Sequence, residues 1–169
     1  MSTFFALFCI VDVPASYITG LLQHAEEHSS NAGNIFCLIE SSEQKRVNKP
    51  TAPPVLDFKT GFRSWSTDDL GKFCKEKFDW RNSKSQPPYI SDSSFAVLDE
   101  RTLKDGTILL ASYTHWQERI NPDDPSDKDE AFRCFQGFRT VRTERNSAPD
   151  NVSVLPEIDF NMVIESLKP

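Results

Sequence analysis

The sequence predicts a single α/β domain, built on a mixed sheet of about six strands with three helices. Three observations lead to this prediction. Apolar runs of strand length recur along the chain, segments of helical spacing separate them, and 38% of the 169 residues are hydrophobic, which is enough for one core. The chain shows neither an internal repeat nor a linker, so we expect residues 1–169 to fold as one unit.

The N-terminal part of the chain has the pattern of a βαβ unit. Residues 3–11 form a continuous apolar run, as in a strand that is covered on both faces. Pro14 then opens a segment whose apolar residues recur at helical spacing, namely Tyr17, Ile18, Leu21, Leu22 and Ala25. Residues 34–40 are a second apolar run of strand length. This order predicts two parallel strands joined by a helix in a right-handed connection.

The next predicted elements are a short strand at 55–58 and a helix that begins near Ser66. Ser66 is a capping residue, and Asp69 stands three positions later, as in a capping box. Trp65 and Leu70 have the spacing of a hydrophobic staple, which fixes how the chain enters a helix. The expected buried face of this helix consists of Leu70, Phe73, Cys74 and Phe78.

Three further strands are expected in the second half of the chain, at 95–98, 107–114 and 132–141. The Asp105–Gly106 pair is a turn signal that leads into the middle one. The alternation of the last strand slips at 136–137, where Gln is followed by Gly, and this slip predicts a β-bulge.

A polar turn and a helix are expected after the last strand. The turn covers residues 146–151, and Asp159 has the character of the helix cap. Ile158 and Val163 have the spacing of a second hydrophobic staple. The predicted buried face of this helix consists of Phe160, Val163, Ile164 and Leu167.

The charge balance argues against two classes of partner. The chain has 19 Lys and Arg residues against 25 Asp and Glu residues, for a net charge of −6. An acidic protein is repelled by the phosphate backbone and by anionic lipid headgroups. No apolar run reaches the length of a transmembrane helix either. We therefore expect no nucleic acid and no membrane among the partners.

The cysteines and the N-terminus predict a cytoplasmic protein. The four cysteines lack the close spacing of zinc or redox motifs, so we expect buried free thiols at Cys9, Cys37, Cys74 and Cys134. The apolar run at 4–11 lacks both the preceding basic residue and the cleavage site of a signal peptide. A reducing compartment fits both observations.

Metal and cofactor motifs are weak or absent. His24, Glu27 and His28 spell H-x-x-E-H, in which two imidazoles one helical turn apart bind zinc. Such peptidases are far larger and need a further acidic ligand, so we interpret the motif as a solvated helix flank. The acidic residues within 123–130 lack the glycine of a calcium loop. Glycine-rich phosphate loops and nucleophile elbows are missing, so the sequence predicts no metal and no cofactor and assigns no catalytic residue.

Three short segments together resemble an uncharacterised family, a domain of unknown function of actinobacteria and fungi. They are Phe95–Leu103, Phe138–Val141, and Asn151–Ser153 leading to Ile158–Phe160. The resemblance covers residues 55–169, whereas the N-terminal part matches less clearly. It implies a compact α/β domain and implies no activity.

Four arginines near the last strand form the leading candidate for recognition. They are Arg133, Arg139, Arg142 and Arg145. Guanidinium groups bind carboxylates and phosphates in fork geometry, so an exposed cluster suits an acidic ligand. In the other arrangement the arginines pair with acids of the protein itself. We favour the second arrangement, in which Arg139 bonds to a carboxylate of the 123–130 segment or to Asp99.

A second candidate site is the corner formed by Asp99, Glu100 and Arg101 after a hydrophobic strand. Polar groups that follow such a strand often line a ligand crevice. The simpler interpretation is that Asp99 caps a turn and that Arg101 pairs with Glu100. His115 is the remaining histidine outside the first helix. The candidate ligand-binding residues are therefore Arg133, Arg139, Arg142, Asp99, Arg101 and His115.

These observations lead to one functional expectation and two alternatives. The expectation is a recognition or regulatory domain that binds a protein partner or an acidic small molecule. The first alternative is a small-metabolite enzyme that uses His115 together with the Asp99, Glu100 and Arg101 corner. The second alternative is an inhibitor or immunity-type protein, whose acidic surface would suit a basic target. The sequence does not decide whether the protein is an enzyme.

Overall fold

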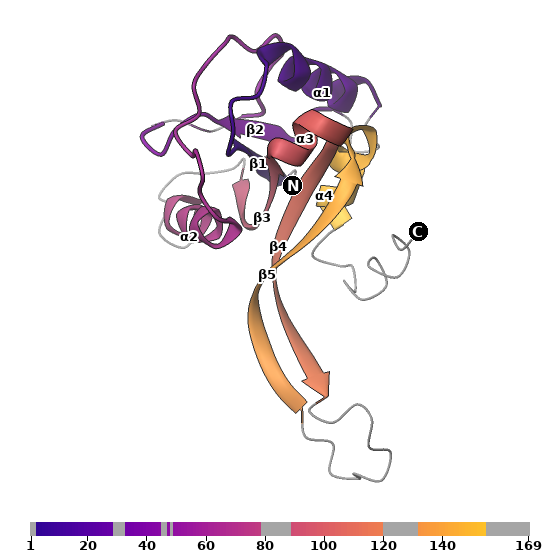
Figure 1. Cartoon of the computed structure of the whole chain (residues 1–169). Helices are drawn as coiled ribbons and strands as arrows, with labels where there is room; N and C mark the ends of the chain where they lie inside the picture. Colours follow the sequence, from indigo (N-terminus) through magenta and orange to yellow (C-terminus); the bar gives the residue numbers. More distant parts are fainter. Residues whose placement is uncertain are drawn as a thin grey trace.

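A mixed sheet of five strands organises the described part of the chain (Figure 1). The computed structural model describes residues 3–28, 33–44, 47, 49–78, 89–119 and 132–154, with the backbone alone at 89, 115–119, 132–135 and 153–154. The strands are β1 (Thr3–Cys9), β2 (Phe36–Ile39), β3 (Tyr89–Leu98), β4 (Thr107–Arg119) and β5 (Phe132–Glu144). Their order in the sheet is β2-β1-β3-β4-β5.

The directions of the strands set the geometry of the sheet edges. Strand β1 pairs in parallel with β2 and with β3, while β4 runs antiparallel to both β3 and β5. Consequently β1, β2, β3 and β5 all run the same way, and their carboxyl ends lie at one edge of the sheet. The predicted α/β class with a mixed sheet and an N-terminal βαβ unit is confirmed.

Helices cover both faces of this sheet. They are α1 (Ala15–His28), α2 (Thr67–Phe78), α3 (Glu100–Asp105) and α4 (Ala148–Val154), and the 3₁₀ turn η1 (Arg145–Ser147) precedes α4. Alternate residues of β1 point to opposite faces, as the pleat of a strand requires. Phe5, Leu7 and Cys9 pack with α1 and α4, whereas Ala6 and Phe8 pack with α2. The apolar run at 3–11 is therefore a strand that is buried on both sides.

The connections place α1 and α2 on opposite faces (Figure 1). Helix α1 links β1 to β2 on one side of β1, and α2 links β2 to β3 on the other side. The order of the strands thus reverses between β1 and β3. Open α/β sheets bind ligands outside the carboxyl ends of the strands at such a reversal.

Strands β4 and β5 continue beyond the sheet as a two-stranded arm (Figure 1). Strand β3 pairs only with Leu109–Ser112 of β4, whereas the β4–β5 ladder runs without a shift from the pair Thr107 and Glu144 to the pair Arg119 and Phe132. The uninterrupted register contradicts the bulge predicted at 136–137. Gly137 is simply the register partner of Thr114.

Two other local predictions are wrong. Residues 55–58 form no strand, because Val55 donates its backbone N–H to Thr19 Oγ1 on α1 and Leu56 is 82% exposed. The predicted polar turn at 146–151 is instead η1 and the start of α4, because Ala148 and Val152 lie one helical turn apart and are buried against the sheet. The described chain consequently has five strands and four α-helices, where the sequence predicted about six and three. The helix predicted from Asp159 lies outside the described residues.

The start of α2 follows its prediction closely. The backbone N–H of Asp69 donates to Ser66 Oγ at 3.2 Å, and the backbone N–H of Ser66 donates to the Asp69 carboxylate at 3.2 Å. This reciprocal pair is a capping box. Trp65 packs against the core on the α2 face, to which Leu70 belongs, and its ring contacts Phe62 and Phe73.

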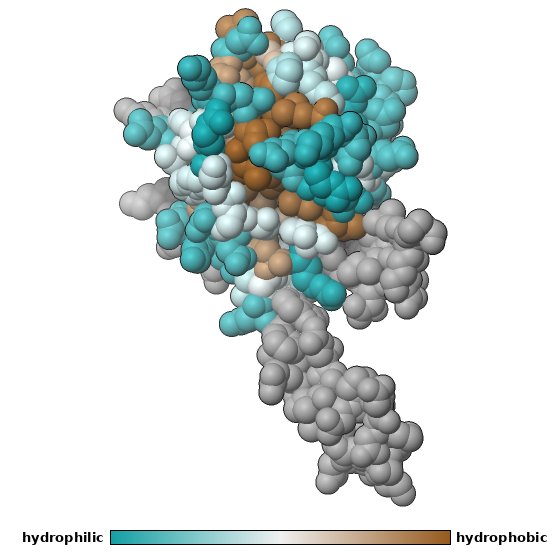
Figure 2. Space-filling model, viewed as in Figure 1, coloured by the Kyte–Doolittle hydropathy of each residue, from teal (hydrophilic) through white to brown (hydrophobic). Residues whose placement is uncertain are grey.

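Large hydrophobic side chains are seldom exposed in the described part of the chain. In Figure 2, hydrophobic residues reach the surface near the middle of the body and hydrophilic residues border them. The large hydrophobic side chains that are exposed within the described ranges are Leu56 and Leu103. In the part of the chain that the structure describes, no helix combines the length and the hydropathy needed to cross a bilayer.

Helix α2 approaches β5 at Gly71. A Cβ atom built on Gly71 would lie 2.0 Å from Phe138 Cε2, so only glycine permits this contact. One turn further along α2, the Lys75 ammonium lies 3.1 Å from the centre of the Tyr113 ring, and Tyr113 is the register partner of Phe138. The root of the arm is therefore held against α2 by close packing and a cation–π contact.

The substitution Gly71→Ala is expected to destabilise the fold by about 1–3 kcal/mol, because the new methyl group overpacks the Phe138 contact. Gly20→Ala in α1 is the matched control. Its Cβ would meet only Arg145 Nη1, at 3.6 Å, so the higher helix propensity of Ala should stabilise the protein by about 0.5–1 kcal/mol. Urea unfolding of both variants measures the difference, and equal stabilities would contradict this description of the α2–β5 contact.

Candidate functional site

Polar side chains gather at the carboxyl edge of the sheet. Helix α1 begins after β1, α3 follows β3, and η1 follows β5, so all three begin at this edge. On the β1–β2 side the edge is covered, because Gly61 N–H donates to Glu40 O at 2.8 Å and Ser64 N–H donates to Ile10 O at 3.2 Å. Thr60 also donates its hydroxyl to Cys9 O. The open part of the edge therefore lies toward β3, β4 and β5.

Asp99 is the central acid of this edge. It lies at the end of β3 and accepts the Arg142 guanidinium from β5 in a two-pronged ion pair, with Arg142 Nη1 at 3.2 Å from Oδ1. Both side chains are mostly shielded from solvent, with 15% of Asp99 and 21% of Arg142 exposed. The pair joins the ends of two strands that are separated by β4.

Asp99 also begins α3. Its Oδ1 accepts the backbone N–H groups of Arg101 and Thr102, while Thr102 Oγ1 accepts the backbone N–H of Asp99 at 3.1 Å, which completes a capping box. Gly106 ends the helix with φ of 75°, a left-handed conformation that favours glycine. Burial raises the pKa of Asp99, but the hydrogen bonds from Arg142 and Thr102 outweigh it and lower the pKa overall.

Asp105 closes the other end of α3. Its carboxylate accepts the hydroxyl of Thr107 at 2.6 Å and the backbone N–H of Thr107 at 2.9 Å, and it accepts Arg101 Nη2 at 3.2 Å. The hydroxyl and the backbone N–H of Thr107, with a smaller contribution from Arg101, lower the pKa of Asp105 to about 2. Thr107 Oγ1 also lies 3.4 Å from Arg142 Nη1, so Asp105 and Asp99 belong to one network.

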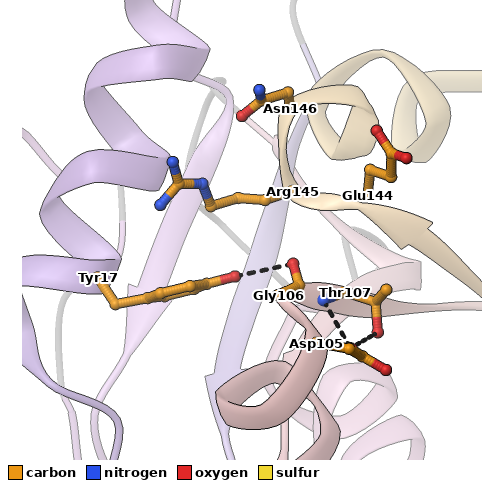
Figure 3. A pocket seen from close by; sticks show the side chains of 7 residues that line it. All are labelled: Tyr17, Asp105, Gly106, Thr107, Glu144, Arg145 and Asn146. Carbon is orange, nitrogen blue, oxygen red and sulfur yellow. Dashed lines mark hydrogen bonds between the residues drawn. The ribbon is translucent and has the colours of Figure 1, made fainter.

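An open pocket of about 400 Å³ lies beside this network (Figure 3). Its walls come from α1, the α3–β4 junction and the β5–η1 junction, and they consist of Tyr17, Asp105, Gly106, Thr107, Glu144, Arg145 and Asn146. The Tyr17 hydroxyl donates to Gly106 O at 3.0 Å and so ties α1 to the end of α3. Burial raises the pKa of Tyr17, and the nearby Arg145 charge opposes that rise.

Arg145 supplies the cation of the pocket. Its guanidinium lies over the Tyr17 ring, 5.2 Å from the ring centre, and reaches toward α1 (Figure 3). Gly20 lies beside it, and a Cβ there would be in ordinary van der Waals contact with Arg145 Nη1 at 3.6 Å. No carboxylate of the described residues lies within ion-pair distance of Arg145.

The structure brings together only part of the residue set predicted from the sequence. Asp99, Arg101 and Arg142 meet at the carboxyl edge, although Arg101 pairs with Asp105 and not with Glu100. The internal partner of Asp99 is Arg142 and not Arg139, because Arg142 lies two residues from the carboxyl end of β5, at the edge where Asp99 ends β3.

The other two predicted residues lie in the arm. The backbone places His115 eight residues from Thr107 along β4, or about 27 Å. Arg133 is the register partner of Glu118, nearer still to the tip. The side chains of His115 and Arg133 lie outside the described part. The structure therefore does not bring His115 to the Asp99, Glu100 and Arg101 corner, as the enzyme alternative required.

Sequence reasoning missed Tyr17, Thr107, Glu144 and Asn146 as neighbours of Arg145. Tyr17 had the spacing of a core residue of α1, and only its hydroxyl distinguishes it from the buried residues around it. The capping residues Asp99 and Thr102, followed by Gly106, indicate the helix α3 in the sequence. A prediction of that helix would have placed Thr107 near the corner formed by Asp99, Glu100 and Arg101.

The H-x-x-E-H motif lies away from this edge. The rings of His24 and His28 stack with their centres 4.5 Å apart on the flank of α1. Among the residues with described positions, no three His, Cys, Asp or Glu side chains converge as metal ligands. Cys9, Cys37 and Cys74 are free and buried, and burial raises the pKa of Cys9 and of Cys37 to about 12, which leaves these thiols protonated at neutral pH. The Cys134 side chain is outside the described part.

Comparisons with protein-family models, with curated proteins and with solved structures found no match to this chain. The resemblance to an uncharacterised family stays a prediction, and the function must be argued from the geometry.

Asp99→Asn is expected to lower the free energy of unfolding at neutral pH by about 1.5–3 kcal/mol, because Asn still caps α3 but loses the charged bond to Arg142. The folded-state pKa of Asp99 is lowered, so its contribution is present above about pH 4 and is lost as the pH falls toward that lower value. The stability difference between wild type and variant should therefore narrow on acidification.

Urea unfolding at about pH 7 and about pH 3 measures this difference. Asp57→Asn removes an exposed carboxylate elsewhere and is the control, which should show little effect at either pH. A difference for Asp99→Asn that stays constant with pH would contradict the role of the ion pair.

Proposed function

We propose that this protein is a recognition domain that binds a small acidic molecule in the pocket between α1, the α3–β4 junction and η1. The observation that carries the proposal is the Arg145 guanidinium. It is half-buried in the pocket wall and lies over Tyr17, without an ion-pair partner among the described residues. A carboxylate or phosphate of a ligand would supply that partner through charge-assisted hydrogen bonds.

The position of the pocket supports the same function. It lies at the carboxyl edge of the sheet, beside the end of β5 and the start of β4, and polar groups beyond the carboxyl ends of strands often line ligand crevices in α/β sheets. Its volume lies within the range of small-molecule sites. The surrounding hydrogen bonds also fix the walls before a ligand arrives, because Tyr17 is held by Gly106 and Thr107 is held by Asp105. Such preorganisation reduces the entropic cost of binding.

Titration with pentanoate, a monocarboxylate, followed by two-dimensional ¹H–¹⁵N NMR, tests this function. The expected result is a saturable shift of the backbone amides of Tyr17, Gly106 and Asn146. Arg145→Met, which keeps an unbranched side chain but removes the charge, should abolish the shift. Arg63→Met is the matched control, because Arg63 is an exposed arginine that pairs with Asp12 outside the pocket.

The proposal fails if pentanoate leaves these amides unshifted at millimolar concentration. It fails equally if Arg145→Met binds pentanoate as well as the wild type does. Thermal unfolding of both variants shows whether each is folded, so that a loss of binding by Arg145→Met is attributed to the charge.

The arm supports a second candidate function, recognition of a protein partner. Beyond Ser112 it is a ribbon of two strands with no third strand among the described residues, and an isolated two-stranded hairpin is at best marginally stable in water. Its sequence contains Tyr113, Trp116, Arg133 and Phe135, of residue types that are enriched in protein interfaces. A partner that packs on the ribbon would provide the missing stabilisation.

Removal of the arm tests this second function. Residues 114–137 are replaced by Asn-Gly, which joins the register partners Tyr113 and Phe138 through a two-residue hairpin turn. If the arm serves a partner and not the fold, the shortened protein should unfold at nearly the same temperature as the full chain. Loss of the cooperative transition would show that the arm stabilises the body and would remove this candidate.

A further inference from the structure

The pocket carries two opposite charges that do not neutralise each other. Glu144 and Arg145 are consecutive residues at the end of β5, and both line the pocket. In Figure 3 the Arg145 side chain extends toward α1, whereas the Glu144 carboxylate points away from it. The Glu144 side chain makes no capping hydrogen bond to η1, although Glu144 occupies the cap position. An anion and a cation thus remain available at separate points of one pocket.

The second acid of the pocket, Asp105, already accepts hydrogen bonds from the protein itself. Asp105 accepts two hydrogen bonds from Thr107 and a further one from Arg101, and its pKa is lowered to about 2 by these partners. Glu144 is exposed and has no ion-pair partner in the described ranges, so it is the acceptor that remains for a ligand cation. The ring of Tyr17 lies below Arg145 and holds its guanidinium at the α1 side of the pocket, away from Glu144 (Figure 3).

We propose that the ligand is a small zwitterion with its two charges at opposite ends of a short chain, such as an ω-amino acid, whose carboxylate binds Arg145 and whose ammonium group binds Glu144. This inference rests on the proposed function and names its ligand class. A dianion would place its second carboxylate near Glu144, and a diamine would place its second ammonium group near Arg145. Both arrangements bring like charges together in a half-enclosed site. Only a molecule with one charge of each sign satisfies both groups.

A matched set of five-carbon compounds tests the inference. The set consists of 5-aminopentanoate, glutarate, pentanoate and 1,5-diaminopentane, which share one chain and differ in their end charges. NMR titration of the full chain should show the tightest binding for 5-aminopentanoate, about tenfold tighter than for pentanoate, because one charge-assisted bond is added. Glu144→Gln should reduce the ratio of the two affinities to near unity. Glu26→Gln, which alters an exposed carboxylate of α1 outside the pocket, is the control and should keep the preference.

The possible outcomes separate this inference from the proposed function. If glutarate or pentanoate binds as tightly as 5-aminopentanoate, or if Glu144→Gln keeps the preference, the zwitterion is rejected while recognition of an acidic ligand stands. If none of the compounds shifts the pocket amides, or only the diamine does, both proposals fall.

Discussion

The architecture depends on one constraint, which is that β1 is buried on both of its faces. A strand in that position needs a covering layer on each side, because its backbone pairs with two neighbours and its side chains alternate between two cores. The two connections of the parallel strands supply these layers by running on opposite faces. The reversal of the strand order accompanies that arrangement. A polar substitution in β1 would therefore disturb one of the two cores directly.

The ion pair of Asp99 and Arg142 stabilises the arrangement of the antiparallel part of the sheet. It joins the end of β3 to the end of β5 across the start of β4, and the same carboxylate caps α3. The position of Thr107 and Gly106, and through Gly106 the position of Tyr17, depends on where α3 ends. One half-buried carboxylate thus fixes much of the pocket wall without touching the space that a ligand would occupy.

The sequence predicted the parts of this fold that depend on local signals. The double-sided apolar run of β1, the periodicity of α1 and the capping box at Ser66 all specify their structure through neighbouring residues, and each prediction was confirmed. The errors concern features that tertiary contacts decide. Val55 is extended but bonds to α1, and Ala148 and Val152 form a helix because the sheet provides a surface for them. The site shows the same division: the sequence identified Asp99 and Arg142 as charged candidates, but their pairing and the neighbours of Arg145 depend on strand order.

The long ladder of β4 and β5 connects the pocket wall with the outer end of the arm. Strand β4 starts at Thr107 in the pocket wall and runs out to Arg119, and β5 returns from Phe132 to Glu144 in the same wall. Twelve residue steps, about 40 Å, therefore connect the outer end of the ladder to the pocket through an unbroken series of backbone hydrogen bonds. The contact of Gly71 with Phe138 anchors this ladder to α2 between its outer end and the pocket. The same two strands therefore supply wall residues of the pocket and the outer ribbon, so a change in the register of β4 against β5 would alter both.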